Sequence, residues 1–208
     1  MTPPSRTLGI AFSDGDRTSR VAGAVVRSDG TLDGLGFERC TVGGTDATDA
    51  AIDLVDALGR EDVRHVACDG IAPAWFNLLD IRRLRDALDR PVYSVSYAES
   101  PGLEPALRDA FDGDALEARL DAYRSLPPRV RVDDDGDSDG DGDSDGDGTA
   151  DPSAGPSAHP LFVRAAGIDA ERAAAAVRGL ARKGFRRPEP LRIAGIAASA
   201  HRIAVEEG

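Results

Sequence analysis

The sequence predicts an α/β fold in which helices cover a mixed sheet. Two observations indicate this class. First, three apolar runs near the N-terminus are joined by tight, glycine-containing turns, which predicts an antiparallel meander. Second, segments with helical spacing of apolar residues then alternate with short strand-like runs, which is typical of parallel strands connected by helices.

The meander is expected to comprise strands over residues 7–12, 20–27 and 32–42. Asp14 and Asp16 fall in the turn after the first strand, where aspartate forms local hydrogen bonds. Two glycines end the third strand, and Thr45 or Asp46 can cap the helix that follows.

The alternating part is expected to contain a helix, a strand, an amphipathic helix and a strand, over residues 47–58, 63–68, 74–88 and 91–97. One broken helix or two short ones should follow, then a strand, a helix and a last helix, over 103–126, 161–168, 169–183 and from Pro190. Three antiparallel strands followed by helix, strand, helix and strand is the ribonuclease-H-like order. We therefore expect strands four and five to be parallel.

The acidity of the chain belongs to one segment. The 208 residues include 37 acidic and 25 basic side chains, for a formal net charge of −12. Residues 133–159 hold ten aspartates and no Lys or Arg, and without them 27 acidic residues face 25 basic ones. This Asp/Gly/Ser tract cannot bury enough apolar area to offset ordering entropy. We expect one domain, formed by 1–132 and 160–208, with a disordered insertion at 133–159; the near-neutral body does not exclude a nucleic-acid partner.

The composition also bears on the compartment. Cys40 and Cys68 lie far apart without a C-x-x-C pair, and no signal-like segment or apolar run of membrane-spanning length occurs, so we expect a cytoplasmic protein without a membrane partner. Lys183 is the only lysine beside 24 arginines, and Asp outnumbers Glu, which suggests a salt-loving organism with a GC-rich genome. The tract resembles the start of an EF-hand loop, but Gly148 stands where calcium needs a bidentate Glu, so a solvated linker is the preferred interpretation.

Four aspartates are candidates for chemistry. Nucleases of the ribonuclease-H-like kind hold Mg²⁺ through carboxylates, because hard cations take oxygen ligands. Asp69 ends the fourth strand, where such a ligand belongs, although Asp-Gly is also a common turn pair and the sequence favours neither interpretation. Asp46 is interpreted mainly as a helix cap, and Asp80 as a solvated acid within the 74–88 helix. The first strand offers no carboxylate at Ala11, and Asp14 is the nearest acid.

The region from Arg172 to Arg192 is basic, with seven positive residues and only Glu189 as an acid. Such a region can neutralise DNA phosphates, or it can be a solvated helix face. The sequence leaves both interpretations open.

Three motifs carry a family resemblance. Residues 43–48 resemble a G-x-D-A-T element, residues 69–81 a D-G-I…G-F-N…D-I stretch, and residues 188–194 the start of a P-E-P-L-R-I-A-H element. In this order and spacing the sequence resembles the archaeal endonuclease dU family, which is related to endonuclease V. The resemblance covers essentially the whole chain apart from the acidic tract.

The resemblance implies a ribonuclease-H-like fold and Mg²⁺- or Mn²⁺-dependent cleavage, in DNA repair, of DNA that contains a deaminated base, deoxyuridine. It implies Asp69, Asp46 and Asp80 as metal ligands, and Asp69 and Asp46, with Asp14 as a replacement acid, as catalytic residues. Two departures stand against activity: Ala11 replaces the strand-one Asp of the family, and Gly195 replaces its C-terminal His. The alternative is therefore a non-catalytic descendant that binds nucleic acid or protein.

Overall fold

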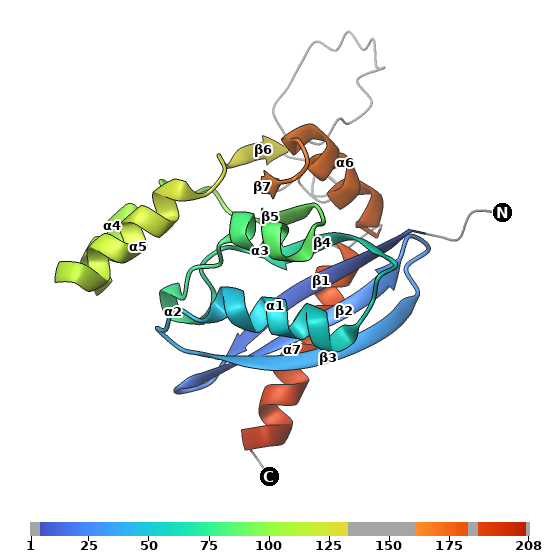
Figure 1. The fold of residues 1–208 in the computed structure, drawn as a ribbon, viewed down its shortest axis with the longest axis horizontal. Coiled ribbons are helices and arrows are strands. Elements are labelled where there is room, and N and C mark those ends of the chain that lie inside the picture. The colour runs from blue at the N-terminus through green and yellow to red at the C-terminus, as the bar shows by residue number, and fades with distance from the viewer. Residues whose placement is uncertain (1–4, 133–160, 183–186, 207–208) are drawn as a thin grey trace, which may run out of the picture.

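The computed structural model describes residues 5–132, 161–182 and 187–206, which form a seven-stranded mixed sheet with helices on both faces (Figure 1). The strands are β1 (Arg6–Asp14), β2 (Thr18–Arg27), β3 (Leu32–Thr41), β4 (Val63–Asp69), β5 (Val92–Ser96), β6 (Val130–Val132) and β7 (Leu161–Ala166). The helices are α1 (Ala47–Leu58), α2 (Pro73–Phe76), α3 (Ile81–Leu88), α4 (Glu104–Ala110), α5 (Gly113–Ser125), α6 (Ala170–Leu180) and α7 (Glu189–Glu206).

The order across the sheet is β3-β2-β1-β4-β5-β7-β6. The first three strands are antiparallel, β4 is parallel to both β1 and β5, and β7 is antiparallel to β5 and β6. Because β1, β3, β4 and β5 run in one direction, their C-terminal ends share one edge of the sheet, here called the C-terminal edge. That edge brings together four strand-end residues: Asp14, Thr41, Asp69 and Ser96.

Apolar residues cover both faces of the sheet. On one face, α1 and α3 pack over a core that includes Leu8, Leu54 and Leu84. On the other, α6 and α7 pack over β1, β5 and β7. The approach of α7 to β1 depends on Gly9, because a Cβ there would lie 2.3 Å from the Pro190 backbone.

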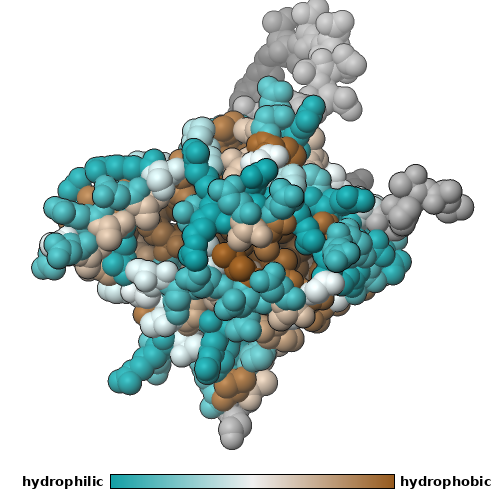
Figure 2. Space-filling view, viewed as in Figure 1, coloured by the Kyte–Doolittle hydropathy of each residue, from teal (hydrophilic) through white to brown (hydrophobic). Residues whose placement is uncertain are grey.

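The visible surface follows this layering. Hydrophilic residues dominate Figure 2, and apolar residues gather at its centre, over the place of α3 and β4 in Figure 1, and at the C-terminal end of α7. None of the helices in the described ranges is long and apolar enough to cross a membrane.

Several sequence-based boundaries need correction. The expected helix over 74–88 is wrong in its first half, because residues 74–76 take left-handed backbone angles and regular helix begins only at Ile81. Asp80 is therefore not inside a helix but precedes one. Asp14 lies within β1, as its last residue, rather than beyond the strand. Strand β6 was not predicted, and the predicted disorder of 133–159 lies outside the described residues.

Candidate functional site

Asp69 lies at the C-terminal edge, on the face of the sheet that α7 covers. Its side chain is 18% exposed, and its Oδ2 lies 3.2 Å from Nη1 of Arg187, just before α7. Burial raises the pKa of Asp69, and the positive charge of Arg187 opposes that shift. The carboxylate thus has a cation beside it that the chain itself supplies.

Ala11 and Gly195, which the sequence resemblance marks as departures, lie beside this ion pair. Ile10 pairs with Cys68, so Ala11 and Asp69 are neighbours one residue further along the parallel strands. Ala11 is fully buried in a small cluster with Ala194 of α7. At Gly195, a Cβ would lie 3.4 Å from Nη1 of Arg187, in van der Waals contact with the guanidinium.

Asp46 belongs to a hydrogen-bond network that joins the end of β3 to α1. Its oxygens accept hydrogen bonds from the Thr41 amide at 3.0 Å, the Thr41 hydroxyl at 2.8 Å and Asn77 Nδ2 at 2.6 Å. Burial acts to raise the pKa of Asp46, but these hydrogen bonds outweigh it and the pKa is lowered. Asp46 stands at the cap position without a capping bond of its own; instead the Ala47 amide donates to Oδ1 of the buried Asn77.

The other two aspartates also have local partners. Asp80 caps α3, since its Oδ1 accepts hydrogen bonds from the amides of Arg82 and Arg83 at 3.0 Å each. Asp14 accepts a hydrogen bond of 2.6 Å from the hydroxyl of Ser19, its direct partner across β1 and β2.

These placements decide how well the acids fit a divalent cation. Mg²⁺ needs several oxygen ligands at 2.0–2.1 Å in octahedral geometry. Within the described part of the chain, no three His, Cys, Asp or Glu side chains are grouped so that they can hold a metal ion. The residues present therefore do not fit a magnesium site, and the metal-ligand and catalytic roles of Asp69, Asp46, Asp80 and Asp14 stay predictions.

Two basic side chains, Arg20 and Arg39, lie on the α7 face near the same edge and are here called the basic row. Arg20 of β2 stands directly opposite Arg39 of β3, and Ser13 of β1 pairs with Arg20 on its other side. Nε of Arg202, from α7, donates to Oγ of Ser13 at 3.1 Å. Among the described residues no carboxylate forms an ion pair with Arg20 or Arg39, in contrast to Arg202, which pairs with Glu206. Like charges opposed across strands are destabilising, so the pair favours an anion from outside.

The turn after β4 exposes an aromatic side chain. Ala74, Trp75 and Phe76 all have positive φ, between 48° and 61°. Each such non-glycine residue costs about 1–3 kcal/mol and persists only where the surroundings impose it. Here the Gly43 amide donates to the Ala74 carbonyl at 2.7 Å, and the indole of Trp75 rests on Gly43.

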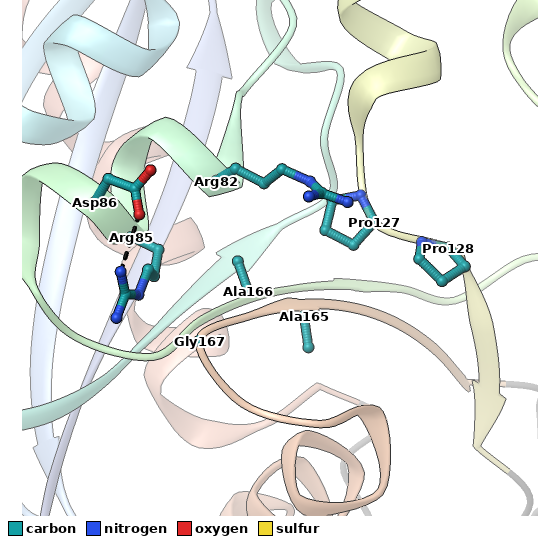
Figure 3. A pocket seen from close by; sticks show the side chains of 8 residues that line it. All are labelled: Arg82, Arg85, Asp86, Pro127, Pro128, Ala165, Ala166 and Gly167. Carbon is teal, nitrogen blue, oxygen red and sulfur yellow. Dashed lines mark hydrogen bonds and ion pairs between the residues drawn. The ribbon is translucent and has the colours of Figure 1, made fainter.

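A cavity of about 450 Å³ opens elsewhere, between α3, the end of β7 and the Pro127-Pro128 segment (Figure 3). Arg82 and Arg85 line it, and Arg85 already pairs with Asp86 at 3.0 Å. Ala166, at its wall, pairs with the first residue of β5, whereas Asp69 pairs with Val95 near the end of that strand. The cavity is therefore at the opposite edge from Asp69.

Comparison with known proteins identifies the family. The profile of the family described as endonuclease dU matches residues 4–202. The chain belongs to the endonuclease dU family. The UPF0215 protein of Pyrobaculum aerophilum is 32% identical over 200 residues, which cover 94% of this chain and 92% of that protein. The resemblance inferred from the three sequence motifs is thus confirmed.

Solved structures confirm the predicted ribonuclease-H-like α/β fold. A protein of unknown function from Archaeoglobus fulgidus superposes with a TM-score of 0.75 at 26% identity, over 95% of this chain and 98% of that one. Endonuclease V of Ciona intestinalis, solved with a DNA that contains inosine, has a TM-score of 0.58 at 12% identity, over 97% and 87% of the two chains. At that identity the likeness to endonuclease V shows the fold of this endonuclease dU family member and nothing finer.

Several residues of the site were not singled out from the sequence. Arg187 was noted only as part of the basic C-terminal region, and its approach to Asp69 depends on how α7 crosses the sheet. Arg20 and Arg39 face each other only because the register of the β2–β3 hairpin shifts by one residue between Val25 and Val26, which the sequence analysis did not predict. The left-handed turn at Trp75 contains no glycine, so the sequence gives no sign of it.

Proposed function

We propose that this protein binds deoxyuridine-containing DNA at the C-terminal edge of its sheet, and that binding needs no divalent cation. Membership of the endonuclease dU family supports DNA with a deaminated base as the ligand class. The arrangement of charges at the C-terminal edge supports the rest.

The opposed pair Arg20 and Arg39 is the observation that carries the proposal. Their two like charges face each other without a carboxylate partner in the described residues. A DNA phosphate would relieve this repulsion and release counterions, the main source of affinity for nucleic acids.

Independence from metal follows from Arg187. In a metal-dependent nuclease, the strand-four carboxylate is neutralised by the cation it binds. Here the guanidinium of Arg187 neutralises Asp69, and the neighbouring position at Ala11 is apolar and buried. Asp69 and Arg187 then form a structural ion pair whose net charge at the C-terminal edge is close to zero.

Metal-dependent cleavage of DNA near deoxyuridine is the second candidate. The position of Asp69 at the end of β4 and its raised pKa favour it, because functional carboxylates often have such shifts. Cleavage would require Asp69 to exchange Arg187 for a cation and to recruit further oxygen ligands.

Fluorescence anisotropy with end-labelled oligonucleotides tests the proposal. The protein should bind an oligonucleotide containing one deoxyuridine more tightly than its thymidine twin, equally in EDTA and in Mg²⁺. Arg20→Glu and Arg39→Glu should each weaken binding by about tenfold, since a contact from an arginine to a phosphate is replaced by a repulsive negative charge. Arg64→Glu, an exposed arginine at the start of β4, is the matched control and should leave affinity unchanged.

Two results would overturn the proposal. One is equal affinity of the Arg39→Glu and Arg64→Glu variants, which would remove the basic row from the interface. The other is strand cleavage by the wild type in Mg²⁺ or Mn²⁺ that Asp69→Ala abolishes, which would establish the second candidate instead.

A further inference from the structure

We infer that Trp75 is a stacking surface for an unpaired base of the bound DNA. This inference rests on the proposed function, and it adds a second contact of a different kind. The basic row would hold the phosphates, whereas the indole would stack on one base that has no pairing partner.

Trp75 is the only tryptophan of the chain, and it is 53% exposed although it is the largest apolar side chain present. The exposed indole is supported from behind. Its ring centroid lies 5.0 Å from that of Phe111 and 6.0 Å from that of Phe76. These two rings pack against the indole, and about half of the Trp75 surface stays exposed.

Arg119 fixes this support. Its guanidinium lies 3.9 Å from the centroid of the Phe111 ring, and its Nη2 donates to the carbonyl of Gly43 at 2.7 Å. The indole packs so closely on Gly43 that a Cβ there would lie 2.8 Å from its Cε3. Segments from three parts of the chain, the ends of β3 and α4 and helix α5, thus converge to hold one exposed ring.

The backbone under Trp75 indicates that its exposure is imposed by the fold. Three consecutive non-glycine residues take left-handed angles, a conformation that is unfavourable for each of them. Ala74 of this turn is buried, and the bond from Gly43 to its carbonyl fixes the turn. Strain retained at a surface aromatic side chain is typical of a binding site that is rigid before its ligand arrives.

The basic row at the same edge of the sheet favours a nucleic-acid base as the occupant. Trp75 rests on the turn directly after β3, the strand that carries Arg39 at the same edge. Aromatic surfaces beside basic residues are the usual means of binding single-stranded nucleic acid, because every base has a face that can stack. The indole and the basic row are therefore positioned to hold a base and its backbone on either side of the C-terminal edge.

Because the chain has one tryptophan, its fluorescence reports on this site alone. We expect a single-stranded oligonucleotide to quench the fluorescence of wild-type protein, with the same midpoint as its anisotropy titration. A fully paired duplex of the same sequence should bind through phosphates with little quenching. Quenching that is equal for both would overturn the inference, because a paired base offers no free face.

Variants provide the second test. Trp75→Ala should weaken binding of the single strand by roughly 5- to 150-fold, and Trp75→Phe by less, because phenylalanine keeps a ring. Leu32→Ala is the control, since Leu32 is 42% exposed at the other end of β3. Unfolding curves establish that each variant is folded.

The two proposals can fail separately. If wild-type protein binds DNA, its fluorescence is unquenched and Trp75→Ala binds as tightly as wild type, the stacking surface is wrong and the proposed function stands. If wild-type protein binds no DNA in the anisotropy assay, the proposed function is wrong and the stacking surface is overturned with it.

Discussion

Asp69 shows at the scale of one residue the arrangement on which the proposal of metal-independent binding rests. A carboxylate at the end of β4 is kept, but it is buried beside a guanidinium rather than beside other acids. Ala11 and Gly195, which the sequence resemblance marks as departures, both adjoin this pair. In the proposed function, Arg187 supplies the positive charge beside Asp69 that a bound cation would otherwise supply.

A pH dependence follows from Asp69. Burial raises its pKa, so the folded state holds this proton more tightly than the unfolded chain does. Its contribution to stability is full below the unfolded pKa of about 3.9 and is lost as pH rises through the higher folded pKa. Asp69→Asn should remove this loss. The free energy of unfolding of the variant, relative to that of wild type, should therefore increase as pH rises. Urea denaturation across this pH range measures the difference; parallel pH profiles would contradict it.

Arg187→Gln, unlike Asp69→Asn, should lower the free energy of unfolding at neutral pH. It leaves the Asp69 carboxylate buried without its cation, and we expect a loss of about 1–2 kcal/mol, moderated because Arg187 is half exposed. The loss should shrink at acidic pH, where Asp69 is protonated. In the Asp69→Asn background the same substitution should cost much less, and equal costs in both backgrounds would show that the pair is not coupled.

At the scale of elements, Asn77 joins three segments. Its amide donates to the Thr41 carbonyl and to Asp46, and its oxygen accepts from the first amide of α1. Because the side chain is fully buried, its removal would leave all of these groups without this partner at once. The turn after β4 ends with Asn77 at the start of α1.

Asn77→Ala should therefore lower the free energy of unfolding by about 2–3 kcal/mol, the cost of leaving buried polar groups unpaired. The pKa of Asp46 should rise, because a hydrogen bond that lowers it is lost. Denaturation measures the first effect and NMR titration of the Asp46 carboxyl the second. The control is Asn77→Asp, which keeps an acceptor for the Ala47 amide but places two carboxylates together; if both variants match wild type, the network has no role.

The sequence predicted elements better than it predicted how they meet. Alternating turns and apolar runs were enough for the meander, for α1 and for the parallel strands, because those patterns are local. The helix over 74–88 was wrong because the apolar spacing through Leu78, Ile81 and Leu84 continues across a break that depends on the distant Thr41 and Gly43. The position of Asp69 was predictable for a similar local reason, whereas its partner Arg187 was not, since 118 residues separate them.

At the scale of the whole molecule, the balance of charge divides into a near-neutral body and the acidic residues 133–159. Of the formal net charge of −12, ten negative charges belong to that segment. In the proposed function, a DNA ligand would meet a basic row on a protein whose overall charge repels it, and salt should moderate both effects.

Deletion of 133–159 should tighten DNA binding by about tenfold at ~0.1 M KCl and hardly at all at ~1 M, where the screening length falls from ~10 Å to ~3 Å. Replacement by a Gly/Ser segment of equal length is the control and should act like the deletion, because charge rather than length is responsible. If the deletion variant fails to fold, the assignment of 1–132 and 160–208 to one domain without that segment is contradicted.

The most direct test of the account is calorimetric titration of the protein with Mn²⁺, in the wild type and in Arg187→Gln, alongside anisotropy with the deoxyuridine oligonucleotide in EDTA. We predict that wild-type protein binds the DNA in EDTA and shows no saturable Mn²⁺ binding, because Arg187 neutralises Asp69. Stoichiometric Mn²⁺ binding that Asp69→Asn abolishes, with DNA binding that requires it, would contradict the account.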